Sequence, residues 1–165
     1  MFDVMGQFWS VAHTKPRCEK KLVKHCEREG IEATLPLHKA IHRYRGKKVV
    51  FWKPLFPGYV FLRLVEEQRR IVLQSDYIAN LLVVTDQELF AHQLAEILTA
   101  LERDVELRLA PTITEGTRVS IKSGPLRGME GWVEKRHGAT TVFLRLDFIG
   151  QAAAAKVEAW ELEPI

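Results

Sequence analysis

The side chains that could bind a metal or act as a nucleophile are concentrated in one segment, at Cys18, His25 and Cys26. Structural zinc sites usually pair ligands about two to five residues apart. Here Cys18 stands alone, and His25 and Cys26 are direct neighbours in the sequence. The remaining histidines are scattered, and neither a glycine-rich phosphate loop nor a Ser/His/Asp order stands out. We therefore predict no metal, no cofactor and no enzymatic activity, which leaves binding as the chemistry of this chain.

The two cysteines also indicate local structure and compartment. Cys18, Leu22 and Cys26 recur every four residues, which predicts a helix from about Pro16 to Gly30 with one apolar stripe. A rise of ~1.5 Å per residue holds the cysteine Cα atoms roughly 12 Å apart, beyond the reach of a disulfide. No apolar run approaches the ~18 residues of a membrane span, and "MFDVMGQFWSVAH" lacks a basic leader with an apolar core. We predict reduced thiols and a cytoplasmic protein.

Positive charge is unevenly distributed along the chain. The formal net charge is only +3, yet residues 36–65 hold seven Lys or Arg and no Asp or Glu. These cations are Lys39, Arg43, Arg45, Lys47, Lys48, Lys53 and Arg63. They create a local positive field that suits a polyanion, but the same charges could only keep the segment soluble.

Hydrophobic periodicity divides the first 104 residues into strands and helices. "FWSVAHT" alternates and predicts a first strand, and residues 31–54 predict two β arms joined at Arg45-Gly46-Lys47. Pro57-Gly58 precedes a strand at 59–64. The later elements are a helix at 66–74, a strand at 77–84 and a helix at 87–102. Because the middle strands are too close for crossover helices, this order predicts an antiparallel sheet flanked by helices.

The chain changes character after Glu102. The stretch "RDVELRLAPTITEG" (103–116) mixes charge, Pro and Gly, which predicts a linker at 105–114. Residues 115–165 hold short alternating runs punctuated by glycine, such as "TRVSI", "GWVEKR" and "TTVFLRLDFI", with a last strand near 156–162. They predict a barrel of about five strands, whose closure avoids exposed edges. The expected fold class is α+β, with domains at 1–104 and 115–165.

Two motifs carry a resemblance to a known family. "RVSIKSGPLRGMEGWVEK", within the stretch from Glu115 to Gly138, resembles a KOW motif, which ribosomal proteins also contain. "PLFPGYVFLRL", preceded by Trp9 and "HTKPRCEKKLVKH", resembles the N-terminal domain of the NusG family of transcription elongation factors. That family includes specialised antiterminators of the RfaH and UpxY type. Together the motifs cover nearly the whole chain in the expected order, and they imply an SH3-like KOW domain at 115–165.

The resemblance implies that RNA polymerase binds at the strand after the "FPGY" turn. In the family this strand presents an apolar pocket to the clamp helices of the largest subunit. Phe56, Tyr59 and Phe61 occupy the matching positions. The alternative is that Tyr59 and Phe61 are ordinary core residues under a helix.

A nucleic-acid site is implied near the N-terminus. Lys15, Lys21 and His25 match positions that face non-template DNA of the transcription bubble in the specialised paralogues, and Arg17 and Lys20 lie beside them. Cations near Trp9 suit single-stranded DNA, although a solvated helix face is the common alternative. The basic arm at 36–53 is expected to touch upstream DNA or only to keep the protein soluble.

The KOW resemblance implies a patch that binds a small-subunit ribosomal protein or the termination factor Rho. The matching residues are Leu126, Met129, Phe148 and Ile149, half of which a fifty-residue domain would need for its core. "QAAAAKVEAWELE" has strong helix propensity, and in the RfaH branch this domain can fold as a helical hairpin. The β-rich "TTVFLRLDFI" favours the barrel here.

Departures from the family limit the resemblance. Gln68, Arg69 and Arg70 stand where the RfaH type has a polar contact to the opposite polymerase jaw, and Asp76 replaces an arginine used for DNA.

The expected protein is a monomer and an elongation factor or antiterminator. A specialised paralogue is favoured over the housekeeping factor, which implies loading at a particular DNA or RNA element. The rival hypothesis is a ribosome-associated KOW protein with a structural role.

Overall fold

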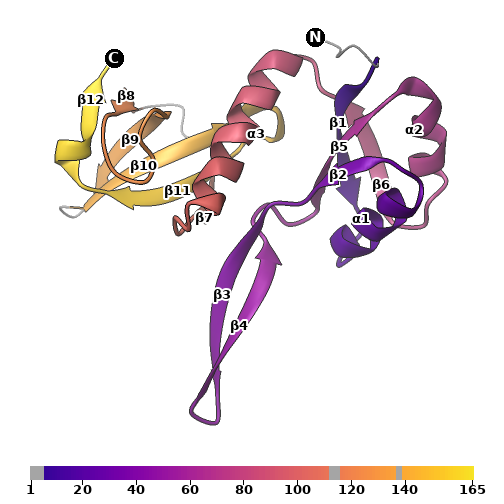
Figure 1. The fold of residues 1–165 in the computed structure, drawn as a ribbon, viewed down its shortest axis with the longest axis horizontal. Coiled ribbons are helices and arrows are strands. Elements are labelled where there is room, and N and C mark those ends of the chain that lie inside the picture. Colours follow the sequence, from indigo (N-terminus) through magenta and orange to yellow (C-terminus); the bar gives the residue numbers. More distant parts are fainter. Residues whose placement is uncertain (1–5, 112–115, 137–138) are drawn as a thin grey trace. The chain divides into compact units, whose positions relative to one another are not determined.

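The structure is a computed structural model that describes residues 6–111, 116–136 and 139–165 (Figure 1). The chain divides into two compact units. The first holds residues 1–36 and 56–91, and the second holds residues 37–55 and 92–165. The predicted α+β class is confirmed in its coarse form, because three α-helices accompany sheets in which every strand pair is antiparallel.

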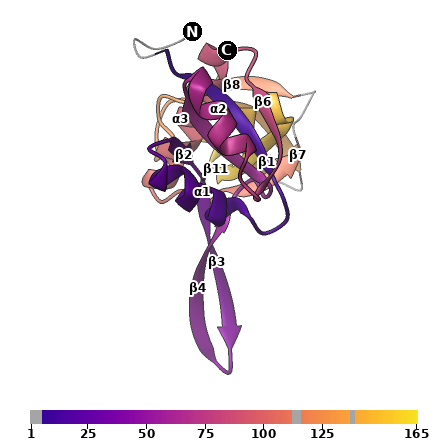
Figure 2. The ribbon, with the colours of Figure 1, turned by 90° about the vertical axis from the view of Figure 1, so that its right-hand side faces the viewer.

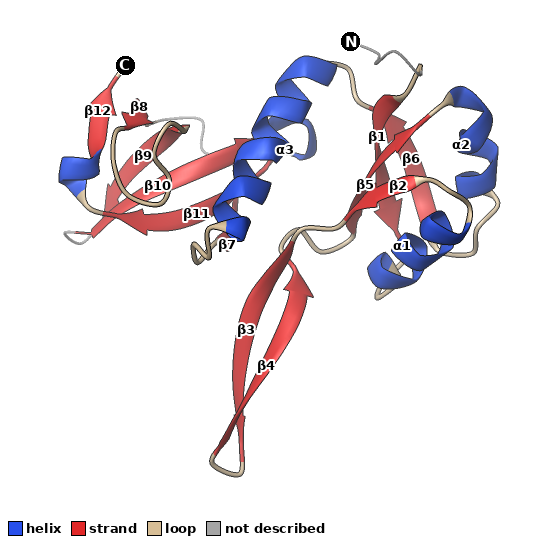
Figure 3. Ribbon diagram, viewed as in Figure 1, coloured by secondary structure: helices blue, strands red, loops and turns tan. Residues whose placement is uncertain are grey.

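The first unit is a four-stranded sheet with the strand order β2-β5-β1-β6. Its strands are β1 (Phe8–Thr14), β2 (Glu32–Thr34), β5 (Tyr59–Leu64) and β6 (Ile78–Val83). Helices α1 (Glu19–Arg28) and α2 (Glu66–Leu73) lie on one side of this sheet (Figure 3). We call that side the first face and the opposite side the second face.

The first face holds the main core of the unit. Strand residues alternate between faces, so Phe8 and Ala12 of β1 share the first face with Val60, Leu62 and Leu64 of β5. Helix α1 adds Leu22 and Cys26, which lie four residues apart, and α2 adds Val72. The apolar stripe predicted on the first helix is confirmed for Leu22 and Cys26, whereas its third member, Cys18, is a half-buried residue that precedes the start of α1.

The starts of α2 and α3 follow local signals. Helix α2 begins where the Gln68 side chain reaches back and accepts a hydrogen bond from the Val65 N–H at 2.9 Å. Helix α3 (Gln87–Glu102) begins after Asp86, whose carboxylate accepts from the Leu89 N–H at 3.1 Å. Helix α3 runs across the boundary of the two units, with residues 87–91 in the first.

The basic arm is a separate two-stranded ribbon formed by β3 (Leu37–Tyr44) and β4 (Lys47–Pro54) (Figure 2). Arg45 and Gly46 form its turn, with φ values of 50° and 77°. Two central residues with positive φ make a type I′ turn, whose twist matches that of paired strands. The predicted arms are therefore present, and the turn is one residue shorter than expected.

The C-terminal sheet differs from the predicted closed barrel of about five strands. Six strands pair in the order β12-β8-β9-β10-β11-β7, and no pairing between β12 and β7 closes this sheet within the described ranges. The strands are β7 (Arg108–Pro111), β8 (Thr117–Ile121), β9 (Glu130–Arg136), β10 (Ala139–Leu146), β11 (Gln151–Val157) and β12 (Leu162–Pro164). Short 3-10 turns at Asp147–Ile149 and Ala159–Glu161 precede β11 and β12.

The extra strand comes from the segment that was interpreted as a linker. Residues 108–111 pair with β11, and Ala110 packs beside Ala152 and Ala154. Alanine favours helices in isolation, but here β11 lies between β10 and β7 with Ala152–Ala155 buried, so pairing overrides propensity. Residues 112–114 of the predicted linker, and Glu115, His137 and Gly138 of the KOW stretch, lie outside the described residues.

None of the described helices combines the length and apolar character needed to cross a membrane. Likewise, the described residues contain no group of three or more His, Cys, Asp or Glu arranged to hold a metal ion.

Candidate functional site

The "FPGY" segment forms a tight turn fixed to its neighbours. The Tyr59 N–H donates to the Phe56 carbonyl at 3.2 Å, and Gly58 has a φ of 87°, which after a proline is typical of a type II turn. The Gly58 carbonyl accepts from the Thr14 N–H at 2.9 Å, and the Gly58 N–H donates to Glu19 Oε2 at 3.2 Å. The turn therefore fixes how Tyr59 enters the sheet beside β1.

The second face of the sheet consists of three cross-strand rows between β1 and β5. The rows are Trp9–Arg63, Val11–Phe61 and His13–Tyr59. Strand β6 extends two of them, with Leu82 opposite Val11 and Asn80 opposite His13. This register brings the predicted residues Tyr59 and Phe61 onto one face.

The start of α3 covers the Trp9 end of this face. The Gln87 amide accepts from the Trp9 N–H at 2.6 Å and donates to the Trp9 carbonyl at 2.9 Å. One turn later, the Phe90 ring lies 5.5 Å from both the Trp9 and Phe61 rings. Phe56 completes the group with a ring separation of 6.2 Å from Phe61. These four rings form one contiguous aromatic cluster.

The three residues predicted to bind polymerase consequently differ in exposure. Phe56 and Phe61 are buried, at 1% and 0% relative exposure, whereas Tyr59 is half-buried. The Tyr59 ring stacks on His13 with a centroid separation of 5.2 Å and an interplanar angle of 18°. Only Tyr59 among the three therefore reaches the surface, and Phe56 and Phe61 lie in the layer behind it.

The accessible part of the second face was only partly foreseen. His13 and Asn80 are exposed, and Leu82 is 43% exposed, so these side chains and Tyr59 form what we call the open end. His13, Asn80 and Leu82 were not among the site residues predicted from the sequence. Alternation along β1 could have placed His13 on the face of Trp9 and Val11, but the partner of His13 depends on the strand register.

Four of the five predicted nucleic-acid contacts are exposed: Lys15, Arg17, Lys20 and Lys21. Lys15 and Arg17 lie in a turn where the Cys18 N–H donates to the Lys15 carbonyl at 3.1 Å. Arg17 has a φ of 62°, a conformation that a non-glycine residue seldom adopts. The turn and the first helical turn of α1 thus present four exposed cations, which we call the basic surface of α1.

His25 is placed differently from the four cations. It is half-buried and meets the Tyr77 ring edge-on at 6.2 Å, and its Nε2 has no hydrogen-bond partner among the described residues. This position indicates packing of α1 against the sheet, so the basic surface is formed by the other four residues.

Cys26 lies in the core beneath α1, where burial controls its acidity. Burial, and secondarily the charge of Glu27, raises the pKa of the Cys26 thiol from 9.0 to about 11. A thiol with this pKa remains protonated near neutral pH, which disfavours a nucleophilic role.

The raised pKa predicts how stability changes at alkaline pH. The pKa of Cys26 is higher in the folded state than in the unfolded state. The contribution of the neutral thiol to the free energy of unfolding is therefore intact below pH 9 and is lost as pH rises towards 11. We expect the urea midpoint to fall more steeply between pH 8.5 and about 10.5 in the wild type than in Cys26→Ala. Equal slopes for the two proteins would contradict this assignment.

The predicted partner patch of the C-terminal sheet is divided between core and surface. Leu126 and Met129 are buried, and the Met129 N–H donates to the Leu126 carbonyl at 3.1 Å within the turn before β9. Phe148 and Ile149 are half-buried in the 3-10 turn at Asp147–Ile149. The alternative that half of this set is core therefore agrees with their burial.

Helix α3 contacts this 3-10 turn within the second unit. The Gln93 amide accepts from the Asp147 N–H at 2.9 Å and donates to Asp147 Oδ2 at 3.1 Å. The Arg103 guanidinium donates to the Pro125 carbonyl at 2.9 Å. The surface around Phe148 and Ile149 is thus bordered by α3 in this conformation.

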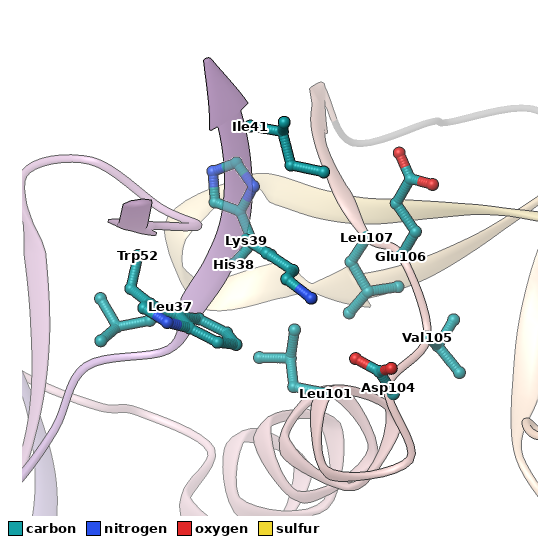
Figure 4. Close-up of a pocket in the computed structure, with 10 residues that line it drawn as sticks. All are labelled: Leu37, His38, Lys39, Ile41, Trp52, Leu101, Asp104, Val105, Glu106 and Leu107. Atoms are coloured by element: carbon teal, nitrogen blue, oxygen red, sulfur yellow. The ribbon is translucent and has the colours of Figure 1, made fainter. Parts of the chain in front are cut away.

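A cavity of about 360 Å³ opens between the base of the ribbon and the end of α3 (Figure 4). Figure 4 shows Leu37, Lys39 and Trp52 on the ribbon side, with Leu101 and Asp104 facing them. The remaining lining residues are His38, Ile41, Val105, Glu106 and Leu107. The lining mixes apolar side chains with opposite charges and lacks a convergent catalytic set among these ten residues.

Comparison with known proteins decides the family. A family model described as "Transcription termination factor nusG" matches residues 7–99, more than half of the chain. The chain belongs to the NusG family. NusG-family proteins are non-enzymatic transcription elongation factors that bind RNA polymerase and partner proteins.

Solved structures agree with the NusG fold. A Thermotoga maritima NusG structure, titled for a domain interaction in that protein, covers 98% of both chains with 20% identity and a TM-score of 0.52. The Mj Spt4:Spt5 complex covers 95% of this chain and 96% of its own, with 15% identity and a TM-score of 0.31. No curated protein matches. The first of these likenesses supports the fold of the NusG-family chain.

Proposed function

We propose that this NusG-family protein binds the clamp helices of the largest subunit of RNA polymerase and suppresses pausing or termination. The observation that carries the proposal is the open end of the second face, where half-buried Tyr59 stacks on His13 and Leu82 is exposed in the neighbouring cross-strand row. Phe56 and Phe61 lie behind Tyr59 and hold its strand in place. A partly exposed aromatic residue supported by a buried layer is a typical anchor for a protein partner.

The remaining surfaces would serve the same complex. Lys15, Arg17, Lys20 and Lys21 would bind non-template DNA of the transcription bubble, since a positive groove holds single strands. We place the N-terminal domain at 1–104 and the C-terminal domain at 115–165. The C-terminal domain would recruit a small-subunit ribosomal protein or Rho through Phe148 and Ile149, which Leu126 and Met129 support from the core. Binding that favours the pause-resistant state of polymerase would shift its population without chemical catalysis. We propose a cytoplasmic monomer and a specialised antiterminator.

A pulldown on core polymerase tests this proposal. Tyr59→Ala should weaken binding about 30-fold or more, equivalent to ~2 kcal/mol, because it removes the aromatic anchor. Tyr44→Ala, an equally large truncation on the exposed ribbon, should leave polymerase binding unchanged. Unchanged binding of Tyr59→Ala, or co-sedimentation of the wild type with ribosomal subunits at high salt without polymerase binding, would favour the ribosome-associated alternative.

A further inference from the structure

The β3–β4 ribbon has two chemically different faces. Directly opposite residues of paired strands share a face. One face of the ribbon therefore carries Leu37, Lys39, Ile41, Val50 and Trp52. This face contributes most of the ribbon residues that line the cavity. The other side carries the pairs His38–Lys53, Ala40–Phe51, His42–Val49 and Tyr44–Lys47. We call this second side the aromatic face of the ribbon.

Three rings gather on the aromatic face. His42 lies 5.3 Å from Phe51 and 6.2 Å from Tyr44, and Tyr44 lies 6.4 Å from Phe51. The Phe51 contacts are edge-to-face, with interplanar angles of 71° and 80°. An edge-to-face contact covers a face of only one ring of each pair, so this cluster keeps ring faces available. Tyr44 is 57% exposed and Phe51 is 39% exposed.

Positive charge borders the same rings. Lys47 lies opposite Tyr44. The Lys53 ammonium donates to His42 Nε2 at 3.0 Å, and its other two N–H groups remain able to donate to a ligand. The two lysines are six residues apart on β4, or roughly 20 Å at ~3.3 Å per residue. The ribbon from Leu37 to Pro54 contains no acidic residue.

We infer that the aromatic face of the ribbon binds single-stranded nucleic acid, with bases stacked on Tyr44, His42 and Phe51 and phosphates held by Lys47 and Lys53. Charge alone would be explained by protection of the two exposed strand edges. Exposed rings work against solubility, however, and unstacked bases are the ligand that uses ring faces and cations together. A duplex would engage the cations and leave the rings without a stacking partner.

The surface is separate in sequence from the open end and from the basic surface of α1. It can therefore be tested with the full chain and free oligonucleotides, without polymerase. To isolate the ribbon, every protein carries Lys15→Gln, Lys20→Gln and Lys21→Gln. Fluorescence anisotropy is measured with 12-nucleotide single-stranded DNA, single-stranded RNA of the same sequence, and the corresponding DNA duplex.

In this background we expect Tyr44→Leu with Phe51→Leu to weaken single-strand binding about ten-fold or more, because leucine keeps apolar area but cannot stack on bases. Lys47→Gln with Lys53→Gln should lower the salt slope of binding by about 1.4, since each single-strand phosphate contact contributes ~0.7. The matched variant Ile41→Ala with Val50→Ala, on the opposite face, should stay within about twofold.

Three outcomes would overturn the inference. Unchanged single-strand binding of the double leucine variant would remove the role of the rings. Equal losses on the duplex would assign the face to double-stranded DNA, and an equal loss in the opposite-face variant would indicate general damage to the ribbon. Tighter binding of either the DNA or the RNA strand would show which nucleic acid is the ligand of this face. A crosslink from a strand containing 5-iodouracil to Tyr44 or Phe51 would support base stacking directly.

Discussion

Phe61→Ala is expected to lower the free energy of unfolding by about 3–5 kcal/mol, the usual range for removing a buried phenylalanine ring. Phe61 is fully buried and contacts both Phe56 and Phe90, so truncation leaves a cavity between the sheet and α3. Most domains are stable by only ~5–15 kcal/mol, so the effect should be visible in urea unfolding as a lower midpoint.

Tyr59→Ala provides the matched control for that measurement. Tyr59 is half-buried and lies at the open end, so its truncation should cost about 1 kcal/mol of stability while it strongly weakens polymerase binding. If Phe61→Ala were no more destabilising than Tyr59→Ala, the aromatic cluster would not be the structure that closes the second face. The two variants thus separate folding from recognition on one strand.

Neutralising the basic surface of α1 is the second change with a large expected effect. Substituting Gln for Lys15, Arg17, Lys20 and Lys21 should lower the slope of log affinity against log salt for single-stranded DNA by about 3, because each lost phosphate contact removes ~0.7. Affinity at low salt should fall on the order of ten-fold or more. The measurement uses proteins with Tyr44→Leu and Phe51→Leu, so that the ribbon contributes little.

A charge-matched variant controls for the loss of net charge. Gln at Arg70, Lys122, Arg127 and Lys156 removes four exposed cations from other parts of the surface. This variant should bind single-stranded DNA nearly as well as its parent. A similar loss in both quadruple variants would mean that binding responds to overall charge and that the residues around α1 form no site.

Local patterns were sufficient to predict the first unit. The four-residue spacing of Leu22 and Cys26 predicted α1, and the Pro57-Gly58 turn before "YVFLRL" predicted the strand β5. Sequence could not decide what covers the second face, because that depends on the register of β1 against β5 and on where α3 begins. The structure places Phe90 there and leaves Tyr59 partly accessible.

The C-terminal sheet was harder to predict for a different reason. "RLAP" is too short and too charged at its start to signal a strand, and its partner β11 consists largely of alanine. Both segments become strands because they pair with each other and bury small side chains, a non-local effect that propensity does not contain. The exposed aromatic face of the ribbon likewise follows from cross-strand pairing, since His42, Tyr44 and Phe51 belong to different strands.

Site-specific photo-crosslinking tests the central claim most directly. With p-benzoylphenylalanine at position 59, the full chain is mixed with RNA polymerase, irradiated, and the crosslinked peptides are identified by mass spectrometry. We expect a crosslink to the clamp helices of the largest subunit, which excess unlabelled wild type suppresses and excess Tyr59→Ala does not. Crosslinks only to other proteins, or to polymerase regions away from the clamp helices, would contradict it.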